Sequence, residues 1–433
     1  MAVLGKAAIY TLGCKVNQYE SQAISELLEK EGVEIVEKGA DAAIVNTCAV
    51  TAESERKARQ TVRRAIRENP GAYLLVTGCA SQNDAKPFWS IKGVDYVNGN
   101  RDKNALAAQI LAYLRTGQKN AGVKVGDLNA LPYEKMEVSS SERTRAYMKV
   151  EDGCESKCAY CIIPRVRGRI VSRPLYDCVD EAKRLAAAGY KEIVLTGIEI
   201  SAYGQDLPGV GLADLICALN DVDGLERIRL SSVDPSLLRP EWIDKVKNCE
   251  KLAPHMHLSL QSGCDGTLRR MRRKYNTAQV LRNVEYMQKV WKHLHFTADV
   301  IVGFPGETDE EFEETCAFVQ KLPLLHTHVF AYSPRPQTEA AEMPGQVAES
   351  VKSERSARLI ALCDGIRDEQ LASAKGRIAK VLFESGCKGH TDDFIEVAVR
   401  EKGLQGQIRA VLLGEAEKGT VSGKLPPEGK DRI

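Results

Sequence analysis

Apolar and polar positions along the first part of the chain follow the pattern of strands that alternate with helices. Apolar runs over residues 7–12, 42–45 and 73–76 are typical of strands, and amphipathic stretches of helical period separate them. This alternation predicts an α/β fold, a small doubly wound parallel sheet, for residues 1–125. The polar segment that follows, 126–143, predicts a linker.

A second alternating series begins after the linker and occupies residues 144–371. It contains six predicted strands, over residues 147–150, 192–195, 227–230, 257–260, 298–302 and 328–332. Helical patterns lie between them, and in one of these Asn276 can cap a helix in which Val280 and Met287 share a face. Six strand–helix units predict a partial (β/α)6 barrel of TIM type.

The pattern changes again over residues 372–433, which contain short strands separated by turns. The predicted strands lie over residues 379–383, 394–399, 407–413 and 420–422. This arrangement predicts a small all-β barrel. Its basic residues suit an oligonucleotide-binding barrel, although a charged surface is common on any small barrel.

The composition narrows the classes of function. Because 60 Lys and Arg stand against 59 Asp and Glu, any affinity for nucleic acid depends on local clusters of charge. The first predicted strand begins without a signal peptide, and no apolar run approaches the roughly 18 residues of a membrane helix, so we expect a cytoplasmic protein without a membrane partner. Thirteen cysteines in such a chain favour metal or redox chemistry over disulfide bonds.

Three cysteines each follow one of the first three predicted strands: Cys14, Cys48 and Cys79. Parallel strands deliver their carboxyl ends to the same edge of a sheet, so the three thiols are predicted to converge. A single cysteine in such a position is usually a small buried residue. Three at one edge favour ligands of an iron-sulfur cluster over core packing.

A second set, Cys154, Cys158 and Cys161, has spacings of three and two residues and lies just after the first strand of the predicted barrel. Three thiolates on one short loop can hold three corners of a 4Fe-4S cube and leave the fourth iron open. Zinc is the alternative, but it usually takes four ligands, and the next histidine along the chain is His255. The spacing therefore favours an iron-sulfur cluster.

This spacing, with Tyr160 before the third cysteine, resembles the signature of the radical S-adenosylmethionine superfamily. The resemblance implies that the three cysteines are cluster ligands, that the open iron binds S-adenosylmethionine, and that cleavage of this cofactor yields a 5′-deoxyadenosyl radical. Tyr160 would lie against the adenine or, alternatively, serve only as a packing aromatic. Other candidates for contacts with the cofactor follow barrel strands, where such sites lie: Gly197, Glu199, Ser231, Ser232 and Gln261.

Over essentially the whole chain, the two cysteine sets and the terminal barrel together resemble the radical S-adenosylmethionine methylthiotransferase family. In that family the N-terminal cysteines would hold an auxiliary 4Fe-4S cluster, giving two clusters, and S-adenosylmethionine would be both methyl donor and radical source. The terminal barrel is similar to the family's RNA-binding TRAM domain. Asp393 and Phe394 stand where the pattern of that domain has Asn and Tyr.

The motif over residues 11–21, with Lys15 and Val16 as its distinctive pair, resembles the threonylcarbamoyladenosine branch of the family. This implies methylthiolation of carbon 2 of N6-threonylcarbamoyladenosine at position 37 of transfer RNAs that read codons beginning with adenine. The partners would be the anticodon stem-loop, an external electron donor and a sulfur donor. The alternatives are the same reaction on isopentenyladenosine 37 or on a ribosomal-protein aspartate, and a non-catalytic RNA-binding metalloprotein.

Three clusters of basic residues are candidates for holding the RNA, because guanidinium groups suit phosphate oxygens. The first lies on a predicted helix and comprises Arg56, Lys57, Arg59, Arg63, Arg64 and Arg67. The second and third comprise Arg165, Arg167, Arg169 and Arg173, and Arg269, Arg270, Arg272, Arg273 and Lys274. We expect these clusters and Phe394 to contact RNA; a solvated protein face is the alternative.

Overall fold

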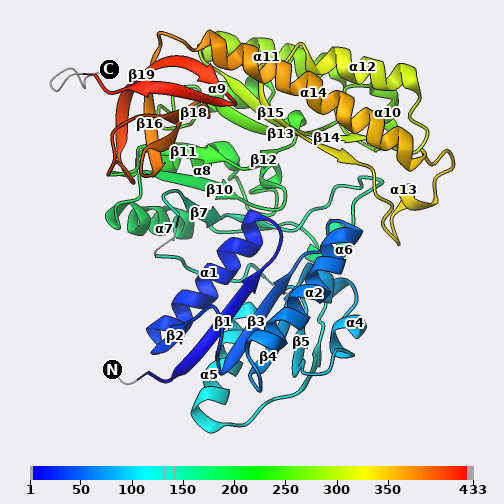
Figure 1. Cartoon of the computed structure of the whole chain (residues 1–433), viewed down its shortest axis with the longest axis vertical. Coiled ribbons are helices and arrows are strands. Elements are labelled where there is room, and N and C mark those ends of the chain that lie inside the picture. The colour runs from blue at the N-terminus through cyan, green and yellow to red at the C-terminus, as the bar shows by residue number, and fades with distance from the viewer. Residues whose placement is uncertain (1–2, 131, 140–142, 427–433) are drawn as a thin grey trace.

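The computed structural model describes residues 3–130, 132–139 and 143–426, and it has three parts (Figure 1). A parallel sheet with its helices, blue and cyan, forms the N-terminal part. A larger set of strands and helices, mostly green to yellow, forms the central part, and the last strands close into a small barrel against it. In these described ranges, no helix is long and apolar enough to cross a membrane.

The N-terminal sheet has six parallel strands in the order β2-β1-β3-β4-β5-β6. The strands are β1 (Gly5–Thr11), β2 (Val33–Ile35), β3 (Ala42–Thr47), β4 (Tyr73–Gly78), β5 (Tyr96–Asn98) and β6 (Gly122–Lys124). The helices are α1 (Lys15–Lys30), α2 (Ala52–Glu68), α3 (Cys79–Asn83), α4 (Lys86–Trp89) and α5 (Lys103–Thr116). Strands β3 and β4 are buried throughout because α1 and α5 cover one face and α2 covers the other. The expected doubly wound sheet is confirmed.

The segment expected to be a linker, 126–143, is fastened to the N-terminal part. The hydroxyl of Tyr19 donates to the carbonyl of Met136 at 2.7 Å, and the carboxylate of Glu26 accepts from the N–H of Ser139 at 2.8 Å. Hydrogen bonds of this kind fix the path of a chain that has no regular structure of its own. Residues 131 and 140–142 of this segment lie outside the described ranges.

The central part is a half-barrel of parallel strands in two hydrogen-bonded groups, β7-β10-β11 and β12-β13-β14-β15. The strands are β7 (Ala146–Lys149), β10 (Glu192–Thr196), β11 (Arg227–Leu230), β12 (Ser232–Val233), β13 (His255–Gln261), β14 (His295–Val302) and β15 (Leu324–Ala331). A small antiparallel pair, β8 (Glu151–Asp152) and β9 (Val171–Ser172), follows the first strand. The six predicted strands are confirmed, with β12 as a short continuation after β11.

Most helices of the central part cover the outer face of this half-barrel, whereas α6 packs against the N-terminal sheet and α13 lies beside the cysteine loop. The helices are α6 (Ile163–Arg167), α7 (Leu175–Ala187), α8 (Leu212–Asn220), α9 (Pro240–Val246), α10 (Asp265–Arg270), α11 (Thr277–Val290), α12 (Asp309–Val319), α13 (Glu339–Glu342) and α14 (Glu349–Ser373), with the 3-10 turns η1 (Ile200–Ala202) and η2 (Pro235–Leu237). Helix α11 starts as predicted, because the side chain of Asn276 accepts from the N–H of Gln279, and Val280 and Met287 are buried.

The C-terminal strands form a closed barrel in the order β16-β17-β18-β20-β19. They are β16 (Ile378–Ser385), β17 (Lys388–Thr391), β18 (Glu396–Ala398), β19 (Ile408–Glu417) and β20 (Thr420–Lys424). Two arginines of β11 fasten this barrel to the central part. Arg227 donates to the carbonyl of Lys380 at 2.9 Å, and Arg229 donates to the carbonyl of Asp392 at 3.1 Å. The predicted small all-β barrel is confirmed.

Candidate active site

The second cysteine set lies on the loop between β8 and α6. The N–H of Cys154 donates to the carbonyl of Gly168 at 3.0 Å, and the N–H of Cys161 donates to the carbonyl of Cys158 at 3.1 Å. Gly153 allows this path: it has φ +89°, and a Cβ there would lie 1.9 Å from the carbonyl oxygen of Arg169. The loop is therefore folded so that its three thiols face one region.

This region is an open cavity of about 450 Å³, lined by all three cysteines of the loop. The exposed Arg165 and Arg169 also line it, as do Arg272 and Glu339. Burial raises the pKa of the Cys154 thiol to about 11 and that of the Cys161 thiol to about 12. Both thiols are therefore neutral at neutral pH and lose protons when they bind a metal cluster.

The first cysteine set lies at one edge of the N-terminal sheet, as predicted. Cys14 caps α1 after β1, Cys48 follows β3, and Cys79 begins α3 after β4. Gly13, the residue before Cys14, lies close to Cys48, since a Cβ on Gly13 would lie 2.9 Å from the Cys48 sulfur. Burial raises the pKa of the Cys14 and Cys48 thiols. Cys79 adds to this effect at both thiols, and Cys14 adds to it at Cys48.

Arg167 connects the helix that follows the second set with Cys79 of the first set. It belongs to a basic cluster that was predicted to contact RNA. Its side chain is fully buried; Nε lies 3.3 Å from the sulfur of Cys79, and Nη1 lies 2.7 Å from a carboxylate oxygen of Glu20 and 3.2 Å from one of Asp152. Nη2 donates to the side chain of Asn17. Helix α6, which follows the loop of the second cysteine set, is thus held against the edge of the sheet that carries the first set.

Both donor sets fit 4Fe-4S clusters. Within the described ranges, no group of three His, Cys, Asp or Glu side chains is arranged to hold a single metal ion. A cubane binds each cysteine through a different iron, so its ligands stand farther apart than those of one zinc ion. A guanidinium lies beside each set, Arg167 near Cys79 and Arg273 at 3.2 Å from the sulfur of Cys158, which suits anionic thiolate ligands.

The candidates for contacts with S-adenosylmethionine gather at the carboxyl ends of the barrel strands. Glu199 follows β10 and caps η1, while Ser231 separates β11 from β12 and has a buried hydroxyl without a hydrogen-bond partner in the described part of the chain. Ser232 begins β12 and is half-buried, and Gln261 ends β13 with a positive φ of 62°. These positions surround the mouth of the half-barrel next to the cysteine loop.

Glu151 is a further member of this group that sequence reasoning did not find. One of its carboxylate oxygens accepts from the N–H of Glu199 at 2.8 Å, and the other is buried without a partner among the described residues. Burial raises its pKa well above the usual range, which favours the neutral carboxyl group. The lack of a side chain at Gly197 leaves room for the Glu151 carboxyl group, because a Cβ at Gly197 would lie 2.6 Å from Oε2 of Glu151. Unsatisfied polar atoms in such a place suit a polar ligand.

Tyr160 belongs to the cysteine loop and packs edge-on against Phe304, with 6.3 Å between the ring centroids. Its ring is half-buried in a small apolar cluster that includes Met271 and Tyr332. The packing role and a contact with the adenine of a cofactor are both compatible with this position.

The basic clusters divide into exposed and buried members. Arg173, expected to contact RNA, is fully buried and pairs with Glu181 at 2.7 Å. Burial and an ion pair remove Arg167 and Arg173 from any surface that RNA can reach, because an unpaired guanidinium in the core would be costly. Arg273 is also mostly buried, paired with Asp234 at 2.7 Å, and Arg270 pairs with Glu311. The exposed members are Arg165, Arg169, Arg269, Arg272, Lys274 and most of the cluster on α2.

Phe394 does not stand free on the barrel surface. Its ring stacks between His255 and His390, with centroids 4.4 and 4.8 Å away, and the guanidinium of Arg229 lies 4.8 Å from its centre. Asp393 is buried and pairs with Arg377 at 2.7 Å and with His295 at 3.0 Å. These two residues hold the barrel against the central part; Phe394 is half-buried there, and its contact with RNA stays a prediction.

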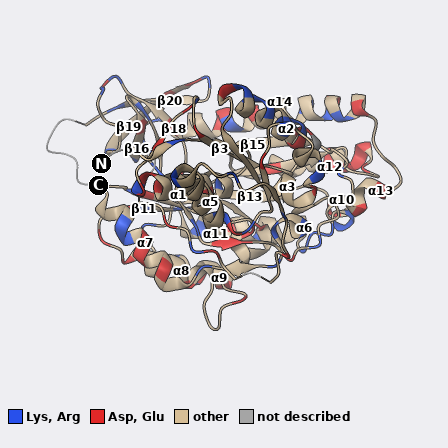
Figure 2. Cartoon of the chain, turned by 90° about the horizontal axis from the view of Figure 1, so that it is seen from below, with Lys and Arg blue, Asp and Glu red and all other residues tan. Residues whose placement is uncertain are grey.

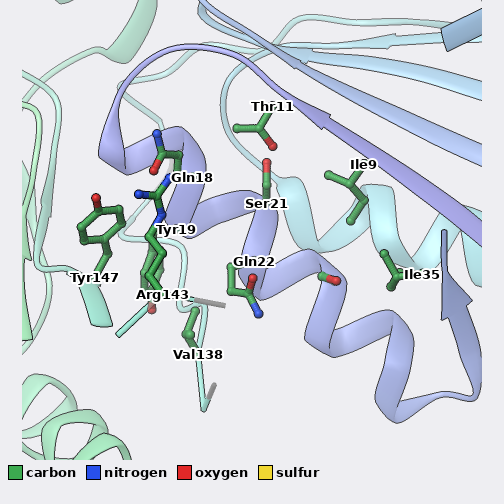
Figure 3. A pocket seen from close by; sticks show the side chains of 11 residues that line it. Ile9, Thr11, Gln18, Tyr19, Ser21, Gln22, Ile35, Val138, Arg143 and Tyr147 are labelled. Atoms are coloured by element: carbon green, nitrogen blue, oxygen red, sulfur yellow. The ribbon is translucent and has the colours of Figure 1, made fainter. Parts of the chain in front are cut away.

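A second cavity, of about 290 Å³, lies beside the first turns of α1 (Figure 3). Gln18 and Gln22 of α1 line it, together with Arg143 and Tyr147 from the segment that leads into β7. Figure 3 shows the Gln18 amide and the Arg143 guanidinium side by side. Gln18 belongs to the motif over residues 11–21, but the sequence did not indicate that Gln22, Arg143 and Tyr147 lie beside it.

The chain matches two family models. Residues 148–319 match the radical SAM superfamily, and residues 6–99 match an uncharacterized protein family, UPF0004. Among solved structures, the radical S-adenosylmethionine methyltransferase TsrM from Kitasatospora setae is similar in fold, with a TM-score of 0.58 and 16% identity, over 78% of this chain and 76% of that one. At this identity the likeness concerns the fold alone.

Curated relatives match over nearly the full length. The threonylcarbamoyladenosine tRNA methylthiotransferase MtaB of Bacillus subtilis is 39% identical over 94% of this chain and 93% of its own, and that of Thermotoga maritima is 37% identical over 97% and 99%. A tRNA-2-methylthio-N(6)-dimethylallyladenosine synthase of Thermoanaerobacter pseudethanolicus is 32% identical over 96% and 92%. These matches show that the chain belongs to the MtaB-type branch of the radical S-adenosylmethionine methylthiotransferases.

Proposed function

We propose that the chain transfers a methylthio group to carbon 2 of N6-threonylcarbamoyladenosine 37 in transfer RNAs that read codons beginning with adenine, in the cytoplasm. Two 4Fe-4S clusters, one on each cysteine set, and S-adenosylmethionine as methyl donor and radical source would serve this reaction. The observation that carries the proposal is the contact of Arg167 with Cys79, because it holds the short helix that follows the second cysteine set against the first set. The sulfur donor and the electron donor would be external.

The chemistry explains the need for two cysteine sets. Carbon 2 of adenine is an unactivated aromatic position without an acidic proton, so nucleophilic substitution has no easy path. When bound, the clusters and S-adenosylmethionine supply a methylated sulfur and a carbon radical. The residues of the chain hold these groups, orient the base and exclude water.

Individual residues are proposed for these tasks. Cys154, Cys158 and Cys161 hold the radical cluster, and Arg273 keeps a positive charge beside it. Ser231 and the carboxyl group of Glu151 offer unsatisfied polar atoms to S-adenosylmethionine. The exposed arginines that line the cavity next to the cysteine loop suit the phosphates of an anticodon loop, in which a base can be flipped out at low cost: Arg165, Arg169 and Arg272.

The main rival is the same reaction on isopentenyladenosine 37, which the relative from Thermoanaerobacter pseudethanolicus keeps open. The higher identities to proteins named MtaB, and Lys15 and Val16 after the first cysteine, favour threonylcarbamoyladenosine. Mass spectrometry of nucleosides from cells that lack the gene tests this choice. We expect 2-methylthio-N6-threonylcarbamoyladenosine to disappear and to return with the gene; loss of another methylthiolated nucleoside instead would reject the substrate.

The cluster assignment has a test of its own. We expect the triple variant Cys14→Ala, Cys48→Ala, Cys79→Ala to retain about half of the iron that the wild type takes up on anaerobic reconstitution, because one of two cubanes is lost. The matched control changes three cysteines outside both sets, Cys217, Cys249 and Cys387, to Ala. Equal iron in the two triple variants would contradict the assignment.

A further inference from the structure

Two buried N–H donors from different parts of the chain meet at the sulfur of Cys79. Nδ2 of Asn100, in the turn between β5 and α5, lies 3.2 Å from this sulfur. Nε of Arg167, in α6, lies 3.3 Å from it. Asn100 is 2% exposed and Arg167 is 0% exposed, so water does not compete with either donor. When Cys79 is a cluster ligand, an amide and a guanidinium therefore donate to an anionic sulfur in a dry environment.

The orientation of the Asn100 amide is fixed by its other partners. Its Oδ1 accepts from Nζ of Lys103 at 2.9 Å, and its Nδ2 also donates to the carbonyl of Val166 at 2.8 Å. The reverse orientation would place an N–H against the ammonium and an oxygen against the carbonyl. The amide therefore presents an N–H group to the sulfur of Cys79.

The backbone of Asn100 is held as firmly as its side chain. Its N–H donates to Oε1 of Gln82 at 2.9 Å, and Gln82 belongs to α3, the helix that Cys79 begins. Its carbonyl accepts from Nζ of Lys103 at 2.6 Å. The donor and the sulfur thus keep their relative position through two separate connections.

One carboxylate positions both donors. Oε1 of Glu20 lies 2.7 Å from Nη1 of Arg167, and Oε2 of Glu20 lies 2.9 Å from Nζ of Lys103, the residue that holds Asn100. Glu20 is 1% exposed and Lys103 is 0% exposed. The two donors therefore belong to a single buried network that reaches the first cysteine set.

A hydrogen-bond donor beside a ligand sulfur makes an iron-sulfur cluster easier to reduce. The reduced cluster carries one more negative charge than the oxidised cluster, and an N–H dipole or a cation stabilises that charge through the sulfur. The effect is strongest where water is excluded, because the local dielectric constant is low. The surroundings of Cys79 meet this condition, and one of the two donors is a cation.

We propose that Asn100, together with Arg167, raises the reduction potential of the cluster on the first cysteine set. The inference rests on the proposed function, which places a cluster there. Asn100 acts through Cys79 and is thus a positioning residue, one that no motif in the sequence indicated.

The proposed reaction needs an electron acceptor at this place. Carbon 2 loses a hydrogen atom to the 5′-deoxyadenosyl radical and gains a bond to the sulfur of a methylthiolate. The carbon radical supplies one electron of the new carbon–sulfur bond, and the sulfur lone pair supplies the other. One electron of that lone pair is left over for the cluster on the first set. A higher reduction potential of this cluster favours the transfer.

The test is a redox titration, monitored by electron paramagnetic resonance, of the full-length chain after anaerobic reconstitution. The background chain carries Cys154→Ala, Cys158→Ala and Cys161→Ala, so that only the first set holds a cluster. We expect Asn100→Leu to shift the midpoint potential of this cluster to a more negative value. Asn100→Asp keeps the size of the side chain and the oxygen that contacts Lys103, but it has no N–H donor, and it should shift the potential in the same direction.

The matched control is Asn69→Leu. Asn69 is also 2% exposed and donates two hydrogen bonds, to Tyr10 and Ala65, but it lies before β4, at the end opposite to Cys79. This variant should keep the potential of the background chain, because a general loss of stability does not change the charge around the sulfur.

An unchanged potential in both Asn100 variants would overturn the inference. Loss of the cluster from both, with normal iron in Asn69→Leu, would also overturn it, because Asn100 would then serve to hold the site together. A background chain that takes up no iron would instead overturn the proposed cluster on the first set, and the inference with it. The failure of the inference and that of the proposed function are therefore distinct.

Discussion

Arg167 is the residue on which the joint between the N-terminal and central parts depends. Its fully buried guanidinium contacts Glu20 of α1, Asp152 of β8 and the sulfur of Cys79. We expect Arg167→Met to lower the free energy of unfolding by roughly 3 kcal/mol, because the buried carboxylates of Glu20 and Asp152 lose one of their cationic partners and keep only Lys103 and Lys149. Chemical denaturation of the chain without clusters measures this effect.

The matched control for this prediction is Arg165→Met, in the same short helix. Arg165 is exposed, so we expect a change within about 0.5 kcal/mol. Arg167→Lys keeps the charge but loses the planar guanidinium whose donors reach three elements. We expect its free energy of unfolding to lie between those of Arg167→Met and Arg165→Met. Equal stability of Arg167→Met and Arg165→Met would show that the buried pairs contribute nothing to the joint.

At the scale of elements, β10 and β11 hold the C-terminal barrel through a buried charge cluster. Burial would raise the pKa of Glu192, but the guanidiniums of Arg229 and Arg227 outweigh this effect and lower the pKa to about 2. The same two arginines donate to backbone carbonyls of the barrel. The carboxylate of Glu192 therefore orients the groups that fasten the barrel.

This depressed pKa predicts the direction of an acid effect. The stabilisation from Glu192 is fully present above the unfolded pKa, near 4.3, and is lost as the pH falls towards 2. We expect Glu192→Gln to lower the free energy of unfolding by roughly 3 kcal/mol at neutral pH and to flatten its dependence on pH between about 4.5 and 2. The control is Glu226→Gln, which affects only a surface pair with Lys191 and should leave the free energy of unfolding and its pH dependence unchanged. A wild-type pH dependence in Glu192→Gln would refute the stabilising role of the Glu192 carboxylate.

The sequence pattern predicted the elements whose signal is local. Strands β3 and β4 each begin with a run of four apolar or aromatic residues, and the cysteines of both sets follow strands at recognisable spacings, so they could be found without tertiary information. The three-residue strands β2, β5 and β6 are too short to show a period. The burial of Arg167 and Arg173 could not be foreseen, because their carboxylate partners come from distant segments and arginine is usually exposed.

At the scale of the whole molecule, charge of both signs is mixed over the surface. Basic and acidic residues both occur along α7 and α14 (Figure 2), in keeping with the formal net charge of +1. Long-range attraction for a polyanion is therefore weak, and affinity for RNA depends on those few cations that are exposed near the site and free of ion pairs. Arg165 and Arg169 meet these conditions within the described ranges, since no ion pair there uses either guanidinium.

The salt dependence of transfer RNA binding tests this selection. If Arg165 and Arg169 each contact a phosphate, Arg165→Ser with Arg169→Ser should reduce the slope of log K against log salt by about 1.5 between 50 and 200 mM KCl, because fewer counterions are released. The control removes the same charge from the outer helix α11, as Arg282→Ser with Lys289→Ser, and should keep the wild-type slope. Equal slopes for both double variants would mean that the cavity beside the cysteine loop does not meet the RNA backbone, and a loss confined to the first pair would place the anticodon loop at the mouth of that cavity.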